Sequence, residues 1–246
     1  MTEACELPPH PILPAWHEEL RAFWLGRVSY DEAHALQERL RDALIAKRSG
    51  PMLLLLEHDP VLTFGRRGES GELKRSLVEI EAQGVTVRQT SRGGRTTYHG
   101  PGQLVGYPIV RLRAVAASVP SYVCAIEEGI IQALAALGIH GEHRDGQPGV
   151  WIGEEKIASV GIAVTHGVAW HGFSLNVGND LSGFDALRPC GLDVQVTSIA
   201  RQVRNPGHLT GHEPSLEHVA ELVTIHLADA FGLQPVYQRG TMSDLG

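Results

Sequence analysis

The segment Gly149–Val177, GVWIGEEKIASVGIAVTHGVAWHGFSLNV, decides the fold that the sequence predicts. It divides into three strand-like runs, GVWIG, KIASVGIAV and GVAWHGFSLNV, joined by turns of a few residues. Strands joined by such short turns pair antiparallel, so the segment predicts a meander. With helices predicted on both sides of it in the sequence, the chain is expected to form a single α+β domain. Its sheets are expected to be mixed, largely antiparallel, and covered by helices on one face.

Apolar residues at helical spacing predict three helices, over residues 30–47 and 121–137 and from Ser215 onward. Met52–Glu57 is a continuous apolar run of the kind found in strands buried on both faces. Further strands are expected at Ala22–Val28, Val85–Gln89 and Leu104–Val110. The tail after about Gln234 is expected to form a small appendage.

Composition excludes several classes of function. Lys plus Arg number 21 against 28 Asp plus Glu, and this acidic balance gives no reason to expect a nucleic-acid partner. The longest strongly apolar run, Met52–Leu56, is too short to span a bilayer, so no membrane segment is expected. Residues 1–15 are acidic and proline-rich, unlike a signal peptide, and are expected to be a flexible arm before a folded domain over 16–246. Three cysteines without C-x-x-C spacing argue against a disulfide framework and for a reducing, cytoplasmic location.

A glycine-rich run, RGGRTTYHGPGQ at Arg92–Gln103, precedes one of the predicted strands. Glycines let a backbone approach a ligand closely, and the interspersed Arg, Tyr, His and Gln side chains supply hydrogen-bond donors. Bare backbone beside polar donors suits a ligand with a polar head and an apolar chain. We therefore expect a binding loop.

Two residues could carry covalent chemistry. Cys190 lies in an irregular Pro-Cys-Gly stretch and is a candidate nucleophile, although a thiol with a pKa of about 8.5 needs a partner to ionise at neutral pH. The alternative is a small buried hydrophobe, which is the role expected for Cys124; Cys5 is expected to be inert. Lys156 opens an apolar strand and either extends to solvent or turns inward, where burial lowers the pKa of its amine. These alternatives stay open on the residues alone, with the solvated lysine favoured.

Metal and nucleotide sites are not predicted. His208-x-x-x-His212 is surrounded by Pro and Gly that oppose helical geometry, and His140-x-x-His143 has no cysteine nearby. His171 is expected to be a structural or pocket histidine. The sequence contains no phosphate-loop, nucleophile-elbow or dinucleotide-binding pattern.

Together these segments resemble the lipoyl(octanoyl) transferase family, which moves an octanoyl chain from acyl carrier protein to a lysine of lipoyl domains. The family's motifs occur in order as RGGRTTYHGPGQ at Arg92–Gln103, GVWIG…KIASVG at Gly149–Gly161, HGFSLNV at His171–Val177 and PCG…TS at Pro189–Ser198. The similarity extends from about Trp24 to Phe231. One departure is Ser174, where the family usually has alanine, and this makes the pocket wall more polar.

The resemblance implies a fold shared with the catalytic domains of biotin and lipoate ligases. It also implies catalysis by Cys190, acylated as a thioester, and Lys156. The substrate-binding residues it implies are Arg92, Gly93, Gly94, Arg95, Thr96, Thr97, Tyr98, His99, Ser159, Val160, Gly161, Gly172, Phe173 and Ser174. No metal and no cofactor are implied, because the phosphopantetheine arm of acyl carrier protein enters as part of the substrate.

The partners implied are acyl carrier protein as octanoyl donor and, as acceptors, lipoyl domains of 2-oxoacid dehydrogenase subunits and the glycine cleavage H protein. The enzyme is expected to be a monomer. Because acyl carrier proteins are acidic, a basic patch is expected at the mouth of the site, drawn from Arg66, Arg67, Lys74, Arg75, Arg111 and Arg113. Rival interpretations are an ATP-dependent lipoate or octanoate ligase, a non-catalytic acyl-chain or carrier-protein binding module, and an amidotransferase that uses an octanoylated protein as donor.

Overall fold

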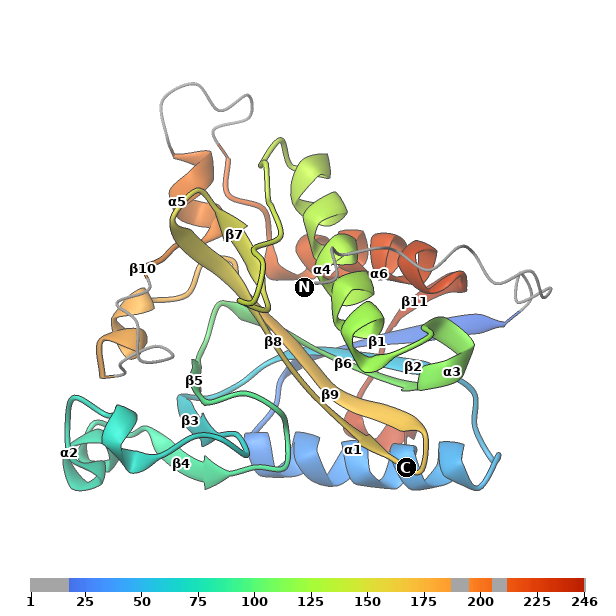
Figure 1. Cartoon of the computed structure of the whole chain (residues 1–246), viewed down its shortest axis with the longest axis horizontal. Coiled ribbons are helices and arrows are strands. Elements are labelled where there is room, and N and C mark those ends of the chain that lie inside the picture. Colours follow the sequence, from blue (N-terminus) through green and yellow to red (C-terminus); the bar gives the residue numbers. More distant parts are fainter. Residues whose placement is uncertain (1–17, 187–194, 205–211, 246) are drawn as a thin grey trace.

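A large mixed sheet forms the centre of the computed structural model, which describes residues 18–186, 195–204 and 212–245. Its eight strands have the order β10-β8-β9-β6-β2-β1-β11, with β7 paired to β8 (Figure 1). The strands are β1 (Glu19–Arg27), β2 (Met52–Glu57), β6 (Gln103–Arg111), β7 (Val150–Ile152), β8 (Glu155–Thr165), β9 (Val168–Asn176), β10 (Gln195–Val196) and β11 (Gln234–Arg239). The pairs β2–β6, β6–β9, β9–β8 and β8–β7 are antiparallel, which confirms the predicted meander.

Helices cover both faces of this sheet, so the expectation of a single covered face is wrong. α1 (Tyr30–Ile45) packs on one face, while α4 (Val119–Ala136) and α6 (Leu216–Phe231) pack on the other (Figure 1). The physical reason lies in β2, where Leu53 and Leu55 enter the core beneath α4 and α6. Leu54 and Leu56 enter the core against α1, because successive side chains of a strand point to opposite faces. An unbroken apolar strand needs cover on both sides.

The three predicted helices are present, and serine side chains cap the N-terminus of each. Ser29 and Ser215 accept hydrogen bonds from backbone N–H groups at the starts of α1 and α6. Ser118 forms a capping box with Ser121, so α4 begins two residues before its predicted start. α6 ends at Gly232, whose φ of 67° suits a residue without a side chain.

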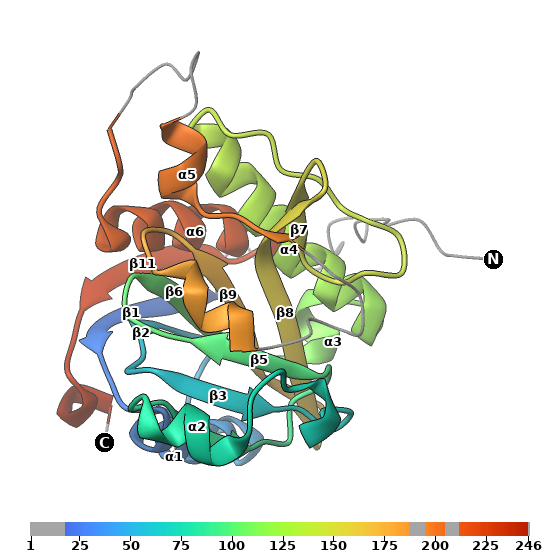
Figure 2. The same cartoon turned by 90° about the vertical axis from the view of Figure 1, so that its left-hand side faces the viewer.

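A second, three-stranded sheet of order β4-β3-β5 lies beside the large one (Figure 2). It consists of β3 (Val61–Phe64), β4 (Thr86–Gln89) and β5 (Thr96–His99), with α2 (Leu77–Ala82) packed against it. Only β4 was expected from the sequence. β5 is the middle third of the glycine-rich run, which is therefore part loop and part strand.

The C-terminal tail belongs to the large sheet, so the expectation of a separate appendage is wrong. β11 pairs in parallel with β1, from Glu19↔Gln234 to Trp24↔Arg239, and forms an edge of the sheet. The remaining short elements are α3 (Leu112–Val115), α5 (Ile199–Val203), η2 (Ser70–Glu72), η3 (Leu181–Ala186) and η5 (Met242–Leu245).

Cys124 is buried on α4, as expected, but it is disulfide-bonded. One bonded cysteine does not make a disulfide framework, and the expectations of no such framework and of a reducing location stay predictions. Within the described ranges, none of the helices combines the length and apolar character that crossing a bilayer requires.

Candidate active site

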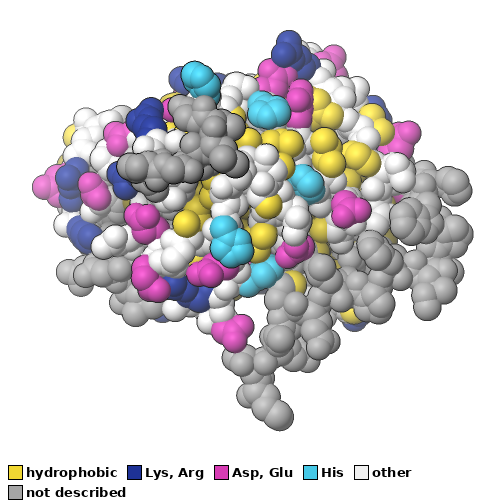
Figure 3. All heavy atoms as spheres, turned by 90° about the horizontal axis from the view of Figure 1, so that it is seen from above, with side chains coloured by type: hydrophobic (Ala, Val, Ile, Leu, Met, Phe, Trp, Pro, Cys, Tyr) yellow, Lys and Arg dark blue, Asp and Glu magenta, His cyan; other side chains and the backbone are white. Residues whose placement is uncertain are grey.

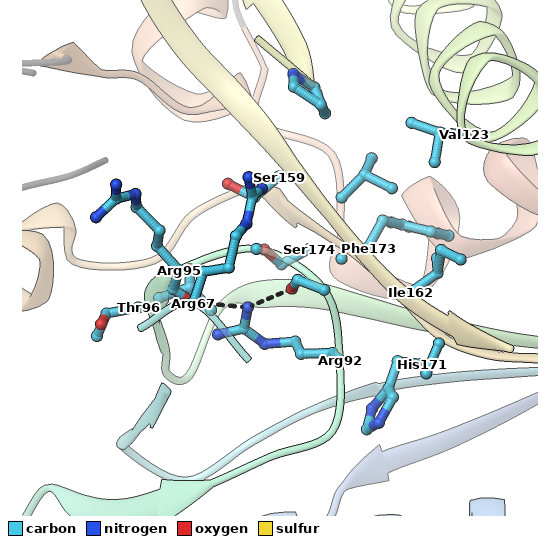
Figure 4. Close-up of a pocket in the computed structure, with 18 of the residues that line it drawn as sticks. Arg67, Arg92, Arg95, Thr96, Val123, Ser159, Ile162, His171, Phe173 and Ser174 are labelled. Carbon is cyan, nitrogen blue, oxygen red and sulfur yellow. Dashed lines mark hydrogen bonds between the residues drawn. The ribbon is translucent and has the colours of Figure 1, made fainter. Parts of the chain in front are cut away.

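A cavity of about 620 Å³ lies between the glycine-rich segment, the strands β8 and β9, and the start of α4. Figure 4 shows its two kinds of wall. Arg67, Arg92 and Arg95 lie on one side of β8, and Val123, Ile162 and Phe173 lie on the other (Figure 4). A volume of this size and a mixed lining are typical of sites for small molecules or acyl chains.

The structure brings together nearly all the residues that the sequence indicated. The cavity is lined by Arg92, Gly93, Gly94, Arg95, Thr96, Thr97, His99, Lys156, Ser159, Val160, Gly161, Gly172, Phe173 and Ser174. Tyr98 is the exception, because its ring packs edge-on against Phe184 with 5.8 Å between centroids. Tyr30, Tyr107 and Val123 line the cavity without having been expected there.

Two glycines allow the loop to lie directly on β8. The N–H of Gly93 donates to the carbonyl oxygen of Ile162 at 2.8 Å. On β8, a Cβ atom added to Gly161 would lie 3.0 Å from the carbonyl oxygen of Gly93. The cavity wall here is backbone on both sides, because any larger residue would push the loop away from the strand.

Arg92 holds the loop in place. Its buried guanidinium donates from Nη2 to the backbone oxygen and the Oγ1 of Thr63, at 2.7 and 2.8 Å. Nη1 donates to the carbonyl oxygen of Arg95 at 2.8 Å. The side chain that the sequence indicated as a ligand donor thus ties the loop to β3 while it lines the cavity.

Glu72 anchors the same loop and was not indicated by the sequence. One of its carboxylate oxygens accepts from Arg95 Nη1 at 2.7 Å, and the other accepts from the N–H and the Oγ1 of Thr96. Its side chain is only 8% exposed, so the ion pair is shielded from water on the glutamate side. An acidic residue in a basic, glycine-bearing surface segment carried no signal of this contact.

Neutral histidines form the inner part of the site. Nδ1 of His99 lies 2.7 Å from Oε1 of Gln103, whose own amide donates to Asn176, so Nδ1 carries the proton in this arrangement. Burial lowers the pKa of His99 to about 3, and it lowers the pKa of His171 to about 3 as well. His171 Nε2 lies 3.1 Å from the hydroxyl of Ser91, which confirms it as a pocket histidine with a hydrogen-bond partner.

Lys156 lies at the rim of the cavity and is half-buried. Its ammonium donates to the backbone oxygen of Pro148 at 2.6 Å and lies 5.2 Å from the centre of the Trp151 ring. Cys190 falls in residues 187–194, outside the described part of the chain. On either side of that segment, Phe184 and Val196 both line the cavity, and Val196 is paired with Lys156 in β10–β8.

The basic residues divide between two places. Arg66 and Arg67 are exposed and line the cavity, as expected of a basic patch at its mouth. Arg111 and Arg113 donate to the backbone oxygens of Leu44 and Ala117 and do not line it. Seen from above, Lys and Arg side chains are most frequent toward the end of the molecule that carries α2 and the small sheet (Figure 3).

In the described ranges, no three or more His, Cys, Asp or Glu side chains are arranged to hold a metal ion. His143 instead contacts two carboxylates, with Nδ1 3.0 Å from Glu127 Oε2 and Nε2 3.2 Å from Glu128 Oε2. The hydrogen bond to Glu127 contributes most to raising the pKa of His143 above its usual value.

The chain is similar in sequence to known proteins over most of its length. Residues 29–227 match the model of the family described as the lipoyl protein ligase A/B catalytic domain. The octanoyltransferase of Chloroflexus aurantiacus (strain ATCC 29366 / DSM 635 / J-10-fl) is 40% identical over 220 residues, which cover 88% of this chain and 96% of that protein.

Two solved structures have a similar fold. A putative lipoate protein ligase from T. acidophilum with bound lipoic acid superposes with a TM-score of 0.69 at 18% identity, covering 92% of each chain. The biotin protein ligase from Aquifex aeolicus in complex with biotin and ATP gives a TM-score of 0.54 at 14% identity, covering 86% of this chain and 70% of that one. The expectation of a fold shared with lipoate and biotin ligases is therefore confirmed.

Proposed function

The chain belongs to the lipoyl protein ligase A/B catalytic domain family, and we propose that it forms an octanoyl thioester on Cys190 and passes the chain to a lysine of lipoyl domains. Octanoyl transfer in lipoate biosynthesis is its activity, in agreement with the family and with a relative named octanoyltransferase that is 40% identical over most of the chain. The identities of the reacting groups and the protein partners are the proposal.

The first half-reaction moves the acyl group to the enzyme. The Cys190 thiolate attacks the thioester carbon of the octanoyl donor, a new C–S bond forms and the C–S bond to the phosphopantetheine breaks. The phosphopantetheine sulfur leaves as a thiol with the proton that the Lys156 ammonium donates, so Lys156 is neutral at the end of this step. The Lys156 ammonium stabilises the thiolate beforehand by its positive charge. No nucleotide is needed, because the thioester already carries the acyl group in an activated form.

The second half-reaction makes the amide. The amine of the acceptor lysine attacks the Cys190 thioester, the C–N bond forms, and the cysteine leaves as thiolate. At pH 7, a lysine with a pKa of about 10.4 is neutral in about one molecule in 2,500, a cost of about 4.6 kcal/mol. Neutral Lys156 accepts the proton of the attacking amine and reduces this cost.

The observation that carries this proposal is the position of Lys156 relative to the chain around Cys190. Val196, six residues after Cys190 in the sequence, pairs with Lys156 and lines the cavity. Phe184, six residues before Cys190, also lines the cavity. The described residues on both sides of the segment that contains Cys190 therefore line the same cavity as Lys156.

The apolar wall supports an acyl substrate. Val123, Val160, Ile162 and Phe173 face one part of the cavity, and each methylene that they shield from water adds about 0.8 kcal/mol to binding. The backbone of the loop and Arg66 and Arg67 lie at the polar part, where a phosphopantetheine arm and an acidic carrier would approach. Acyl carrier protein as donor, the two classes of lipoyl-domain acceptor, action as a monomer without a cofactor and a cytoplasmic location remain predictions.

Intact-mass measurement after mixing with octanoyl acyl carrier protein tests the proposal. Wild-type protein should gain one octanoyl group, and hydroxylamine should remove it because the bond is a thioester. The Cys190→Ser variant should form no such thioester. The Lys156→Met variant should acquire the adduct far more slowly. A ligase would need ATP and would tolerate Cys190→Ser, whereas a binding module would bind the carrier without a mass increase. An octanoylated protein offered as donor in parallel identifies an amidotransferase. Persistence of full transfer in Cys190→Ser would refute the thioester.

A further inference from the structure

Glu127 is a carboxylate in an apolar place. It lies on α4 with its side chain 9% exposed, next in sequence to Ile126, which is fully buried in the main core. A buried carboxylate is costly unless hydrogen bonds stabilise its charge. Glu127 has such bonds, since Oε1 accepts from the N–H of Gly149 at 2.6 Å and Oε2 lies 3.0 Å from His143 Nδ1.

The hydrogen bond to Gly149 connects Glu127 to Lys156 through one peptide group. The N–H that Glu127 accepts from and the carbonyl oxygen that accepts from Lys156 Nζ belong to the same bond, Pro148–Gly149. In a trans peptide these two groups point in opposite directions in one plane. The peptide therefore has the α4 carboxylate on one side and the β8 ammonium on the other.

Packing around Gly149 limits where Lys156 can go. A Cβ atom at Gly149 would lie 2.4 Å from Lys156 Cε and 2.3 Å from the carbonyl oxygen of Ala158. The lysine stem therefore lies in the space that a side chain at residue 149 would fill. The centre of the Trp151 ring lies 5.2 Å from Nζ of the same side chain. Any rotation of the Pro148–Gly149 peptide would move the acceptor of the ammonium.

We propose that Glu127 is a positioning residue for the reaction: by holding the Pro148–Gly149 peptide it fixes the carbonyl oxygen on which the Lys156 ammonium docks at the cavity rim. A carboxylate on the N–H also polarises the peptide, so that its carbonyl oxygen becomes a stronger acceptor. His143 Nδ1 contacts the other carboxylate oxygen, Oε2, so both oxygens of Glu127 have a hydrogen-bond partner. This inference rests on the proposed role of Lys156.

The test compares three variants by steady-state and single-turnover octanoyl transfer. Glu127→Ala removes the acceptor for the Gly149 N–H, and kcat should fall about tenfold or more because a misplaced catalytic group is costly, while KM for the carrier stays the same. Glu127→Gln keeps an acceptor oxygen, and its amide can donate to His143 Nδ1, so it should restore most of kcat. Glu128→Gln is the matched control, since Glu128 contacts His143 but not Gly149, and it should leave kcat unchanged.

A second readout separates positioning from simple stability. Because Glu127→Gln removes a negative charge near the ammonium, the basic limb of its kcat–pH profile should move to lower pH, whereas loss of stability alone would leave that limb in place. Melting temperatures identify variants that fail to fold. If all three variants keep wild-type kcat and pH profile while wild-type protein forms the Cys190 adduct, the positioning role is wrong and the proposed function stands. If wild-type protein forms no adduct, the proposed function itself fails.

Discussion

Gly161 controls the width of the cavity where the glycine-rich loop crosses β8. A side chain there would meet Gly93 O at 3.0 Å and Arg92 Cδ at 3.3 Å. Gly161→Val should displace the loop, cost about 1–3 kcal/mol of stability through overpacking, and narrow the acyl space. We expect the rate with octanoyl donor to fall much more than the rate with butyryl donor, measured side by side.

Gly50→Val supplies the control for this prediction, since nothing lies within 4 Å of a Cβ atom built at Gly50. Its ratio of octanoyl to butyryl rates should equal that of the wild type. An equal loss with both donors in Gly161→Val would show that the residue does not limit chain length.

The sequence predicts which residues line the site better than it predicts which residues form hydrogen bonds with each other. The glycine and arginine content of the loop predicted a binding surface. Residues 92–97 and His99 do line the cavity, whereas Tyr98 and the last four residues of the run, 100–103, do not. Nothing in the residue pattern indicates that Arg92 binds Thr63, 29 positions away, or that Glu127 accepts from Gly149, 22 positions away. Such pairs depend on how elements pack, which residue types and local spacing do not specify.

At the scale of elements, the segment between β3 and α2 places Arg66 and Arg67 at the cavity while both remain exposed. Replacing both with glutamate should raise KM for acyl carrier protein several-fold and weaken its dependence on salt, with kcat unchanged, because rim charges act on encounter. Steady-state rates at several ionic strengths check this.

The matched control for this double variant reverses Arg39 and Arg48, which are exposed and do not line the cavity. These changes alter the net charge of the protein equally but should leave KM for the carrier unchanged. Equal effects of the two double variants would mean that only the overall charge matters and that the segment is not a docking site.

Elements with strong local patterns were predicted, and elements that depend on distant partners were not. β2 could be recognised because its five consecutive apolar residues require burial on both faces. β11 (QPVYQR) has mixed polarity and forms a strand because the edge of β1 is open to it. β5 was concealed in the glycine-rich run, since its pairing partner β3 lies more than thirty residues earlier.

At the scale of the whole molecule, three buried histidines make stability depend on pH. Burial lowers the pKa of His58 to about 4 and the pKa values of His99 and His171 to about 3. In the unfolded chain each histidine titrates near 6.5, so below that pH the unfolded state binds more protons than the folded state. The contribution of these neutral histidines to the free energy of unfolding is complete above pH 6.5 and is lost as the pH falls toward 4. His143, with its raised pKa, acts in the opposite direction but is one group against three.

Each of the three histidines contributes up to about 1.4 kcal/mol per pH unit in this window, so the free energy of unfolding should fall clearly between pH 7 and pH 5. Urea denaturation at half-unit steps measures this directly. Ring proton shifts in NMR give the local readout, with His99 and His171 remaining neutral at pH 5 while His143 is protonated. A free energy of unfolding that is constant from pH 7 to pH 5, or an imidazolium signal from His99 at pH 5, would contradict the neutral histidine network. Because His99 and His171 line the cavity, an imidazolium signal from His99 would also mean that the inner wall beside the acyl chain is charged and not neutral.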